Sequence, residues 1–494
     1  MIPDDPAAMG EYWMQVAWLR GLGYGRQTRP ITFRILITLM VALVPLWCFP
    51  SNVTGKPVTV RVSVNARGAL ANDYSSRPVL SGDGRYVAFT SAASNLVPGD
   101  TNRSGQNPFK GRDVFVYDRM RRRIRRVNLS SAGAQANGAT GSPKLSADGR
   151  VIAFSSSASN LVPGDTNGSP DVFVHDLRDR TTTRVSVSND GAQATGGSGG
   201  MDISADGRFV AFASSALDLV ADNTTGITGM VLHDRVLHKT VRVAADPRGP
   251  SGLFLDRLRL SADGRVVAFS AVETSRPGGA VIHRGGLYTY DMVRHTTELV
   301  SVSSTGERPN DACLFGSAIT SCEPRNILAA ISADGRYVTF SSTASNLVPG
   351  DTNSATDVFV RDRLAQTTRR VSVASDGSQA CPRGWRPYPN ASLYGPCGSG
   401  AAAASTDGRL IAFFSQYADL DRVHDYYSQG AGDVFLHDRR TGRTERVSVG
   451  THRSGASSAA ISGDGRFVAF ASTSRLLGNR ARSWQLYLRG PLTD

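Results

Sequence analysis

The chain has 494 residues, 40% of them hydrophobic and 20% charged, which is ordinary for a globular protein and does not indicate disorder. The net charge of +13 permits an anionic partner, although arginines scattered over a solvated surface would produce the same value. The 51 glycines indicate many turns.

The N-terminal region contains one long apolar segment, Ile35–Phe49. Four arginines precede it: Arg20, Arg26, Arg29 and Arg34. The segment is shorter than the roughly 20 residues of a membrane span and is typical of the apolar core of a secretory signal. Because the basic flank stays in the cytoplasm, we expect residues 1–50 to act as a signal peptide or a signal anchor. The remainder would be exported, either secreted or anchored to the cytoplasmic membrane; cleavage and a later start at Met14 stay open.

A nine-residue string recurs seven times after this segment and consists of a small residue, any residue, Asp-Gly-Arg and an apolar run. Its copies are Ser81–Phe89, Ser146–Phe154, Ser204–Phe212, Ser261–Phe269, Ser332–Phe340, Ser405–Phe413 and Ser462–Phe470. The aspartates recur at intervals of 57 to 73 residues, which indicates repeated supersecondary units rather than several unrelated domains.

Each repeat predicts four strands, here called A to D. The Asp-Gly pair forms a tight hairpin between strands A and B, because glycine accepts the positive φ of such turns. Strand C is seen in Asp113–Asp118 and strand D in Arg125–Leu129 and Thr183–Val187. Strands B and C are apolar on both faces, as blades packed between two neighbours require. We therefore predict an all-β, seven-bladed β-propeller of four-stranded antiparallel blades over residues 58–490.

The two ends of the chain predict how the ring closes. The last repeat has strands A and B in Ala459–Ser472 and strand C in Gln485–Leu488, but no strand D follows. Thr59–Val64 reads as a strand D with no blade before it. We expect Thr59–Val64 to join the last blade as its outer strand, which hides an edge prone to aggregation.

The Ser-Ala-Asp-Gly-Arg turn and the Asp-Val-Phe-Val-x-Asp strand resemble the TolB-type, WD-like propeller repeat of bacterial envelope proteins. The resemblance covers Thr59 to Leu488 and implies the fold, whereas TolB's partners are not carried over, because one repeat serves many roles. We see no distinct N-terminal domain of the TolB kind. The repeat also resembles propellers that gate peptidases, but Gly196–Gly200 does not form a nucleophile elbow and we expect no hydrolase domain.

The loop between strands B and C supplies candidate metal ligands in two repeats. They are Asp165, Asn167 and Asp171 in the second and Asp351, Asn353 and Asp357 in the fifth. Oxygen ligands at positions one, three and seven partly resemble a calcium-binding EF-hand loop, so a structural Ca²⁺ is one interpretation. The alternative is that these side chains tighten the loop by bonding nearby backbone N–H groups.

Other polar groups favour structural roles. His175, His233 and His437 occupy one position before the end of strand C, where other repeats have tyrosine or arginine, so we expect partly exposed strand ends rather than catalysis. The aspartate that ends strand C is expected to cap the turn to strand D. The basic run Arg119–Arg126 is expected to be a solvated hairpin, and its lack of aromatic neighbours argues against nucleic acid.

Two insertions between repeats carry the remaining cysteines apart from Cys48. We expect disulfides in an oxidising compartment, most simply Cys313–Cys322 and Cys381–Cys397, although other pairings and a metal site stay open. The second insertion also contains three aromatic residues: Trp385, Tyr388 and Tyr394. Rigid aromatics on a stapled loop are typical of recognition surfaces, but they can equally cover the propeller.

Taken together, these features predict a non-enzymatic, exported binding or scaffold propeller. It would recognise a protein or an anionic envelope polymer through the face that carries the insertions, require no cofactor, bind no nucleic acid, meet the membrane only through its N-terminal segment and be monomeric. The alternative is a polysaccharide lyase or hydrolase with its site in the central channel. That site would need charged side chains on the innermost strands, which look small, as in Ala401–Ser405. A third class is an anchored structural protein of the envelope.

Overall fold

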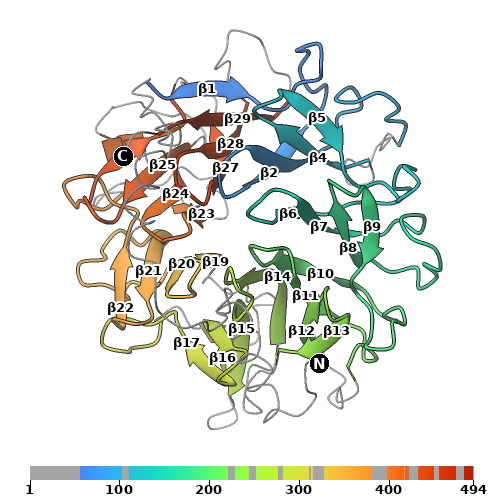
Figure 1. Ribbon diagram of the computed structural model, residues 1–494. Coiled ribbons are helices and arrows are strands. Elements are labelled where there is room, and N and C mark those ends of the chain that lie inside the picture. Colours follow the sequence, from blue (N-terminus) through green and yellow to red (C-terminus); the bar gives the residue numbers. More distant parts are fainter. Residues whose placement is uncertain are drawn as a thin grey trace, which may run out of the picture.

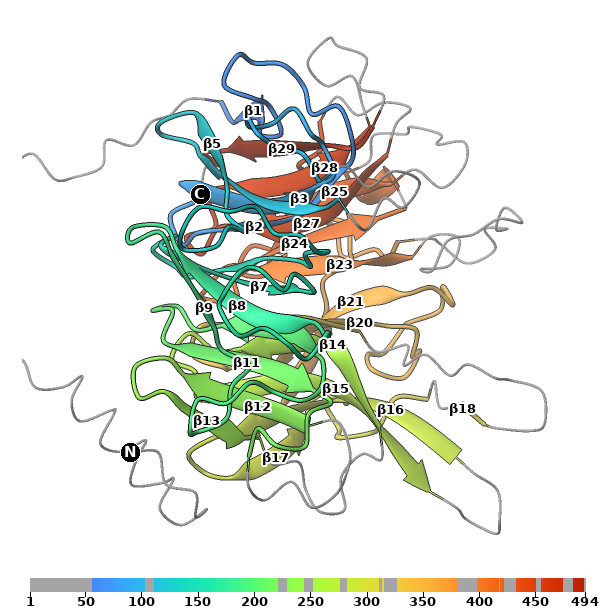
Figure 2. The same cartoon turned by 90° about the vertical axis from the view of Figure 1, so that its right-hand side faces the viewer.

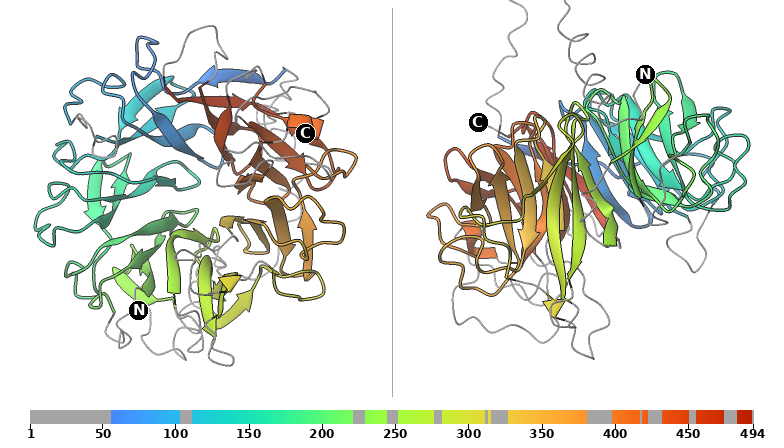
Figure 3. Two further views of the ribbon diagram at one scale, coloured as in Figure 1. Left: turned by 180° about the vertical axis from the view of Figure 1, so that it is seen from behind. Right: turned by 90° about the horizontal axis from the view of Figure 1, so that it is seen from below.

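The computed structural model describes residues 56–102, 111–220, 229–243, 252–275, 282–310, 313–314, 327–380, 398–416, 418–421, 432–449, 455–473 and 483–492. Within these ranges, 29 strands form seven antiparallel sheets arranged around a common axis (Figure 1), and Figure 3 shows the same ring from behind. The predicted seven-bladed β-propeller is confirmed. In the described part, no helix is long and apolar enough to cross a membrane.

The blades follow one another along the chain, and each runs from its innermost strand outwards. Blade 1 comprises β2 (Ser75–Leu80), β3 (Tyr86–Ser91), β4 (Asp113–Asp118) and β5 (Arg123–Arg126); blade 2 comprises β6 (Lys144–Leu145), β7 (Val151–Ser156), β8 (Asp171–Asp176) and β9 (Thr181–Arg184); blade 3 comprises β10 (Ser198–Ile203), β11 (Phe209–Ser214), β12 (Gly229–Asp234) and β13 (Lys239–Arg242). Blade 4 comprises β14 (Gly252–Leu260), β15 (Val266–Ser275), β16 (Ile282–Asp291) and β17 (Thr296–Leu299), with β18 (Cys313–Leu314) beside β16. Blade 5 comprises β19 (Ile327–Ile331), β20 (Tyr337–Ser342), β21 (Asp357–Asp362) and β22 (Thr367–Arg370); blade 6 comprises β23 (Ser399–Ala404), β24 (Leu410–Ser415), β25 (Asp433–Asp438) and β26 (Thr444–Arg446), with the 3₁₀ helix η2 (Ala418–Asp421); blade 7 comprises β27 (Ala456–Ile461), β28 (Val468–Ser472), β29 (Gln485–Gly490) and β1 (Val58–Arg61).

The recurring string is explained by the turn between the two inner strands. In blade 1, the Ser81 hydroxyl donates to Asp83 Oδ1 at 2.7 Å, and the Arg85 backbone N–H donates to the same oxygen at 2.9 Å. Gly84 has a φ of 64°, and a Cβ at this position would lie 2.4 Å from the Phe467 ring of blade 7. Both the backbone conformation and the packing between blades therefore require glycine here.

The hydrophobic core lies between neighbouring blades. Strands β3 and β4 are buried along almost their whole length, as the apolar runs predict. Within blade 1, the Phe89 and Phe115 rings stack with centroids 5.8 Å apart, and equivalent aromatic pairs recur in five of the other blades. Each blade therefore presents a dry surface to both neighbours, which stabilises a ring rather than a sandwich with one wet face per sheet.

The ring closes as the sequence predicts. Strand β1 pairs with β29, and Val58 lies opposite Gly490 while Arg61 lies opposite Tyr487. The pairing continues one residue further, because the Val62 N–H donates to the Leu486 carbonyl at 2.8 Å. The first strand of the chain thus completes the last blade.

The outermost strands begin and end earlier than predicted. Strand β9 covers Thr181–Arg184 instead of Thr183–Val187, and β5 is displaced likewise. After Arg184 the Val185 N–H still donates to the Val172 carbonyl at 2.9 Å, but the Val172 N–H donates to the Ser186 hydroxyl at 3.1 Å. That hydroxyl donates in turn to Asp171 Oδ1 at 2.6 Å. A side chain therefore replaces the continuing ladder.

Alternation of strand direction gives the ring two distinct faces. The turns joining strands A to B and C to D lie on one face, here called the turn face. The loops joining B to C and each blade to the next lie on the other, here called the insertion face. Figure 2 shows β15 and β16 leaving the ring on the insertion face. These strands have ten residues each, whereas the equivalent strands of the blade before have six, and β18 pairs with the start of β16.

Candidate functional site

On the insertion face, the loops between strands B and C are held by an arginine that lies between two aspartates. In blade 5, Arg370 Nη1 lies 3.3 Å from both Asp351 Oδ1 and Asp357 Oδ2. The same arrangement occurs in three other blades: Arg126 with Asp100 and Asp113, Arg184 with Asp165 and Asp171, and Arg446 with Asp421 and Asp433. Each arginine comes from the outermost strand, so the cluster fastens the loop to the blade.

The predicted calcium ligands of blade 2 lie within one of these clusters. Gln193 Nε2 donates to Asp165 Oδ1 at 2.9 Å and to Asp171 Oδ2 at 3.0 Å. Asn167 directs its amide N–H, not its oxygen, toward Asp171 at 3.4 Å, and it also donates to the Ala194 carbonyl at 2.8 Å. Both carboxylates therefore already accept hydrogen bonds from protein donors.

The equivalent carboxylates of blade 5 are buried, and burial changes their pKa values. Asn353 donates to Asp357 at 3.1 Å and to the Ala380 carbonyl at 2.9 Å. Burial raises the pKa of Asp357 to about 6 despite the charge of Arg370, and burial also raises the pKa of Asp351. Within the described ranges, no group of three or more His, Cys, Asp or Glu side chains is placed to hold a metal ion. The calcium site stays a prediction.

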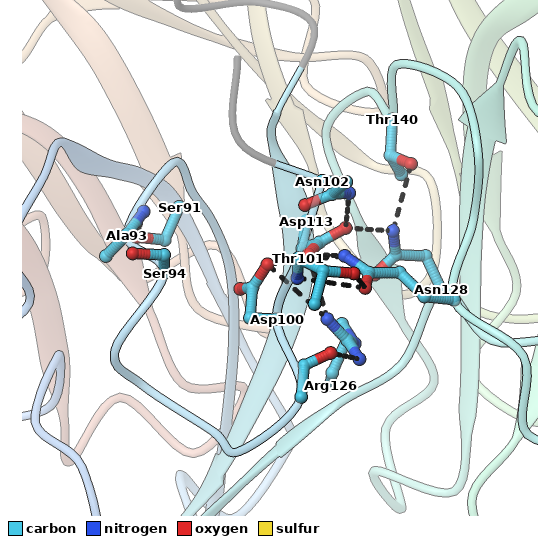
Figure 4. Close-up of polar contacts among 12 residues, drawn as sticks. Ser91, Ala93, Ser94, Asp100, Thr101, Asn102, Asp113, Arg126, Asn128 and Thr140 are labelled. Carbon is cyan, nitrogen blue, oxygen red and sulfur yellow. Dashed lines mark hydrogen bonds and ion pairs between the residues drawn. The ribbon is translucent and has the colours of Figure 1, made fainter. Parts of the chain in front are cut away.

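Figure 4 shows the corresponding cluster of blade 1. The Asn128 amide donates to Asp113 Oδ1 at 2.6 Å and to the Thr140 hydroxyl at 3.2 Å, while Asn102 donates to Asp113 at 3.1 Å. Arg126 also donates to the Gly99 carbonyl at 3.1 Å. Sequence reasoning missed the arginine, although a signal exists: arginine stands directly before the Val-Asn or Val-Ser pair at the end of each of these strands D.

Charged side chains lie on the innermost strands of blades 2 to 4, so the expectation of small innermost residues is wrong there. Lys144 Nζ lies 3.3 Å from Asp202 Oδ1, and Asp202 Oδ2 accepts the Leu260 N–H at 3.0 Å. Arg259 Nε donates to the Ala329 carbonyl at 2.7 Å. Each contact joins one blade to the next. Burial, reinforced by the charge of Arg259, lowers the pKa of Lys144 to about 8.

The histidines before the end of strand C are buried, which corrects the prediction that they are partly exposed. Their exposed fractions are 3–6%. In blade 2, His175 Nδ1 lies 2.9 Å from the Thr182 hydroxyl, which donates to the Leu129 carbonyl of blade 1. His233 and His437 make equivalent contacts, and burial lowers the pKa of each to about 4. These neutral histidines therefore fasten one blade to the next.

Most of the predicted insertion residues lie outside the described residues: Cys322, Cys381, Trp385, Tyr388, Tyr394 and Cys397. Only the backbone of Cys313 is described, where β18 pairs it with His283 of β16. Both predicted disulfides and the aromatic binding patch stay predictions.

The seven antiparallel sheets arranged around one axis define the chain as a seven-bladed β-propeller. No protein-family model matches it, and no curated protein matches its sequence. Among solved structures it is similar to TolB from Acinetobacter baumannii, with 14% identity, a TM-score of 0.36 and coverage of 71% of this chain and 64% of that one. The putative TolB from Agrobacterium tumefaciens has 14% identity and a TM-score of 0.36, covering 77% of this chain and 98% of that one.

A third similar structure is the β-propeller domain of the Trilobed protease from Pyrococcus furiosus. It has 11% identity and a TM-score of 0.48, with coverage of 85% of this chain and 98% of that one. At such identities and TM-scores, the similarity concerns the fold alone and says nothing about activity.

Proposed function

We propose that the protein is an exported, non-enzymatic binding or scaffold propeller that recognises a protein or an anionic envelope polymer through its insertion face. The observation that carries the proposal is the projecting hairpin of blade 4. All seven blades have the same type of turn and the same kind of core. Blades therefore differ from one another mainly in their insertions. Export is supported by the apolar segment Ile35–Phe49 behind its basic flank.

The non-enzymatic part of the proposal is supported by the contacts of the innermost strands. Lys144 and Asp202 neutralise each other, and Arg259 donates to backbone carbonyls. Each buried histidine contacts a threonine of its own blade, and that threonine donates to a carbonyl of the preceding blade. The enzyme alternative draws on one observation, the lowered pKa of Lys144, because an amine that is partly neutral near pH 8 is a candidate base.

Cross-linking and capture from the native envelope tests the binding face. Replacing Glu273–Arg284 with Asn-Gly would shorten the hairpin at the register pair Val272 and Gly285 while keeping the ring. We expect this variant, and the pair Trp385→Ala and Tyr394→Ala, to lose partner capture. Arg440→Ser on the turn face serves as the control and should retain capture. Undiminished capture by both insertion-face variants would overturn the proposal.

The enzyme alternative has its own test. Purified protein is incubated with anionic polysaccharides, and release of reducing ends or unsaturated sugars is measured. We expect no release. Turnover by the wild type that disappears in Lys144→Met would establish an enzyme at the innermost strands and contradict the proposal.

A further inference from the structure

The turn face holds a cavity of about 320 Å³ between blades 1 and 2. Apolar side chains, among them Leu177, form part of its wall, and two aspartates stand against five arginines. The arginines are Arg121, Arg123, Arg125, Arg150 and Arg178. A concave site with this surplus of guanidinium groups attracts an anion.

Three of these guanidinium groups are available to a ligand. The Asp118 carboxylate pairs with Arg121, and Arg150 pairs with Asp176 and Asp179 outside the lining. In the part of the chain that the structure describes, the guanidinium groups of Arg123, Arg125 and Arg178 form no hydrogen bond or ion pair, and all three residues are exposed. The free positive charge of the cavity therefore comes from Arg123, Arg125 and Arg178.

The arginines of strand β5 distinguish this blade from its neighbour. Arg123 and Arg125 lie opposite Asp118 and Val116 in the register of β4 and β5, so both project from the same side of the strand. The equivalent positions of blade 2 are Thr181 and Thr183. The basic run that sequence analysis assigned to a solvated hairpin thus supplies part of a cavity that the repeat alone does not produce.

A second, independent feature marks the turn face. Among the described residues, the four most exposed large hydrophobic side chains are those of Leu364 at 75%, Met120 at 66%, Val236 at 64% and Val58 at 60%. The first three stand in turns between strands C and D, and Val58 pairs with Gly490 at the end of β29. All four therefore lie on the turn face, and the first three directly follow an arginine in the sequence: Arg363, Arg119 and Arg235. Apolar side chains next to basic ones are typical of surfaces that lie against a lipid headgroup layer.

The path of the chain leads to the same face. Strand β1 starts at Val58 on the turn face, nine positions after the apolar segment Ile35–Phe49 ends. A linker of this length spans at most about 30 Å when fully extended, at roughly 3.3–3.6 Å per residue. A membrane that receives the apolar segment, during export or as an anchor, would meet the turn face first.

We infer that the turn face is a membrane-contacting surface and that the cavity between blades 1 and 2 binds the phosphate of an anionic phospholipid headgroup. Arginine suits this ligand, because its planar fork donates two hydrogen bonds to phosphate oxygens. The exposed apolar side chains enter the headgroup layer around it. The inference goes beyond the proposed function and replaces the expectation that only the N-terminal segment meets the membrane. The insertion face would then point away from the membrane.

The test uses the full chain reconstituted into lipid nanodiscs, with hydrogen–deuterium exchange as the readout. Discs of phosphatidylcholine alone are compared with discs that also contain phosphatidylglycerol. We expect peptides covering Arg119–Arg126 and Arg363–Thr367 to be protected at least fivefold more in the phosphatidylglycerol discs. A peptide covering Gly164–Asp171 on the insertion face should exchange equally in both.

Matched variants separate the cavity from general charge. Arg123→Thr with Arg125→Thr introduces the residues that blade 2 carries, so the fold should be retained, and the lipid-dependent protection should disappear. Arg67→Thr with Arg369→Thr removes the same charge at exposed positions outside the cavity and should leave the protection intact. Equal loss in both double variants would overturn the cavity as the site.

A soluble headgroup distinguishes the source of the phosphate. Glycerol 1-phosphate at millimolar concentration, added to phosphatidylcholine discs, should not protect the turn peptides. If glycerol 1-phosphate alone reproduces the protection, the cavity is a site for a soluble phosphate and the membrane inference is wrong. Absence of protection in both kinds of disc would also refute it, while leaving partner capture by the insertion face, and thus the proposed function, untouched.

Discussion

Arg208 and Asp234 form a two-point ion pair in blade 3, with Nε 3.0 Å from Oδ1 and Nη2 2.6 Å from Oδ2. Asp234 is fully buried, and the pair joins the turn between strands A and B to the end of strand C. The same pair recurs in five further blades: Arg85 with Asp118, Arg150 with Asp176, Arg265 with Asp291, Arg336 with Asp362 and Arg409 with Asp438. Blade 7 differs, because its strand C ends at Gly490 and Arg466 forms no ion pair with a described residue.

Removing the arginine of a buried pair should be costly. Arg208→Met leaves the Asp234 carboxylate buried without its partner, and we expect the free energy of unfolding to fall by about 3–5 kcal/mol. Arg466→Met makes the same chemical change at an exposed position without a carboxylate and should cost less than about 0.5 kcal/mol. Urea unfolding of both variants measures the difference. Equal destabilisation would show that the repeated ion pair contributes little.

Stability should fall as the pH is lowered from 7 to 4. The folded-state pKa values of His233 and His437, about 4, lie below the unfolded value near 6.5, so the unfolded chain binds more protons in this window. Each histidine therefore contributes stability that is present above pH 6.5 and is lost as the pH falls to 4, up to about 3 kcal/mol. Asp357 has the opposite effect on stability: its pKa is raised to about 6, so the folded chain binds more protons at this site as the pH falls, and its contribution to stability increases.

A variant isolates the histidine contribution from that of Asp357. Blades 1 and 4 carry tyrosine at the equivalent position, so His437→Tyr is a substitution that the blade already accommodates elsewhere. We expect urea unfolding of this variant to depend less on pH between 7 and 4 than that of the wild type. An unchanged pH dependence would mean that His437 is not buried as a neutral ring.

The part of the structure that could be predicted from sequence is the part set by local contacts. The Ser81, Asp83 and Gly84 turn closes within a few residues, so its string marks every blade. Ring closure was predictable too, because a missing strand at one end matches a surplus strand at the other.

The features that the sequence did not predict depend on contacts between residues far apart in the chain. Lys144 meets Asp202 only because two blades stand side by side, and the threonine that contacts His175 donates to a carbonyl of the preceding blade. Arg184 at the end of β9 pairs with Asp165 in the loop between β7 and β8. The sequence shows that an arginine recurs before each Val-Asn or Val-Ser pair, but not which carboxylates it meets, so the carboxylates were assigned to a cation.

Thermal unfolding with Ca²⁺ or with EDTA should decide whether the loops between strands B and C bind a calcium ion or are held by the arginine. Because Arg370 already lies against Asp351 and Asp357, we expect the same Tm with 5 mM Ca²⁺ as with EDTA, within about 1 °C. In Arg370→Met the two carboxylates lose their cation, so Tm should fall and Ca²⁺ should restore part of it. A clear rise of the wild-type Tm with Ca²⁺ would instead establish the predicted ion site.

Closure of the ring can be tested at a single backbone group. The Val62 N–H donates to the Leu486 carbonyl, and the Val62 side chain is fully buried. Val62→Pro therefore removes both a hydrogen bond of the strand pairing and packing in the core. We expect a loss of at least about 3 kcal/mol, proteolysis near residue 62 and self-association through the exposed edge of β29. Val58→Pro is the control, because proline is tolerated at the first residue of a strand and Val58 is largely exposed. Limited proteolysis and size-exclusion chromatography compare the two variants. If Val62→Pro remains as resistant and monomeric as Val58→Pro, the N-terminal strand does not hold the last blade closed.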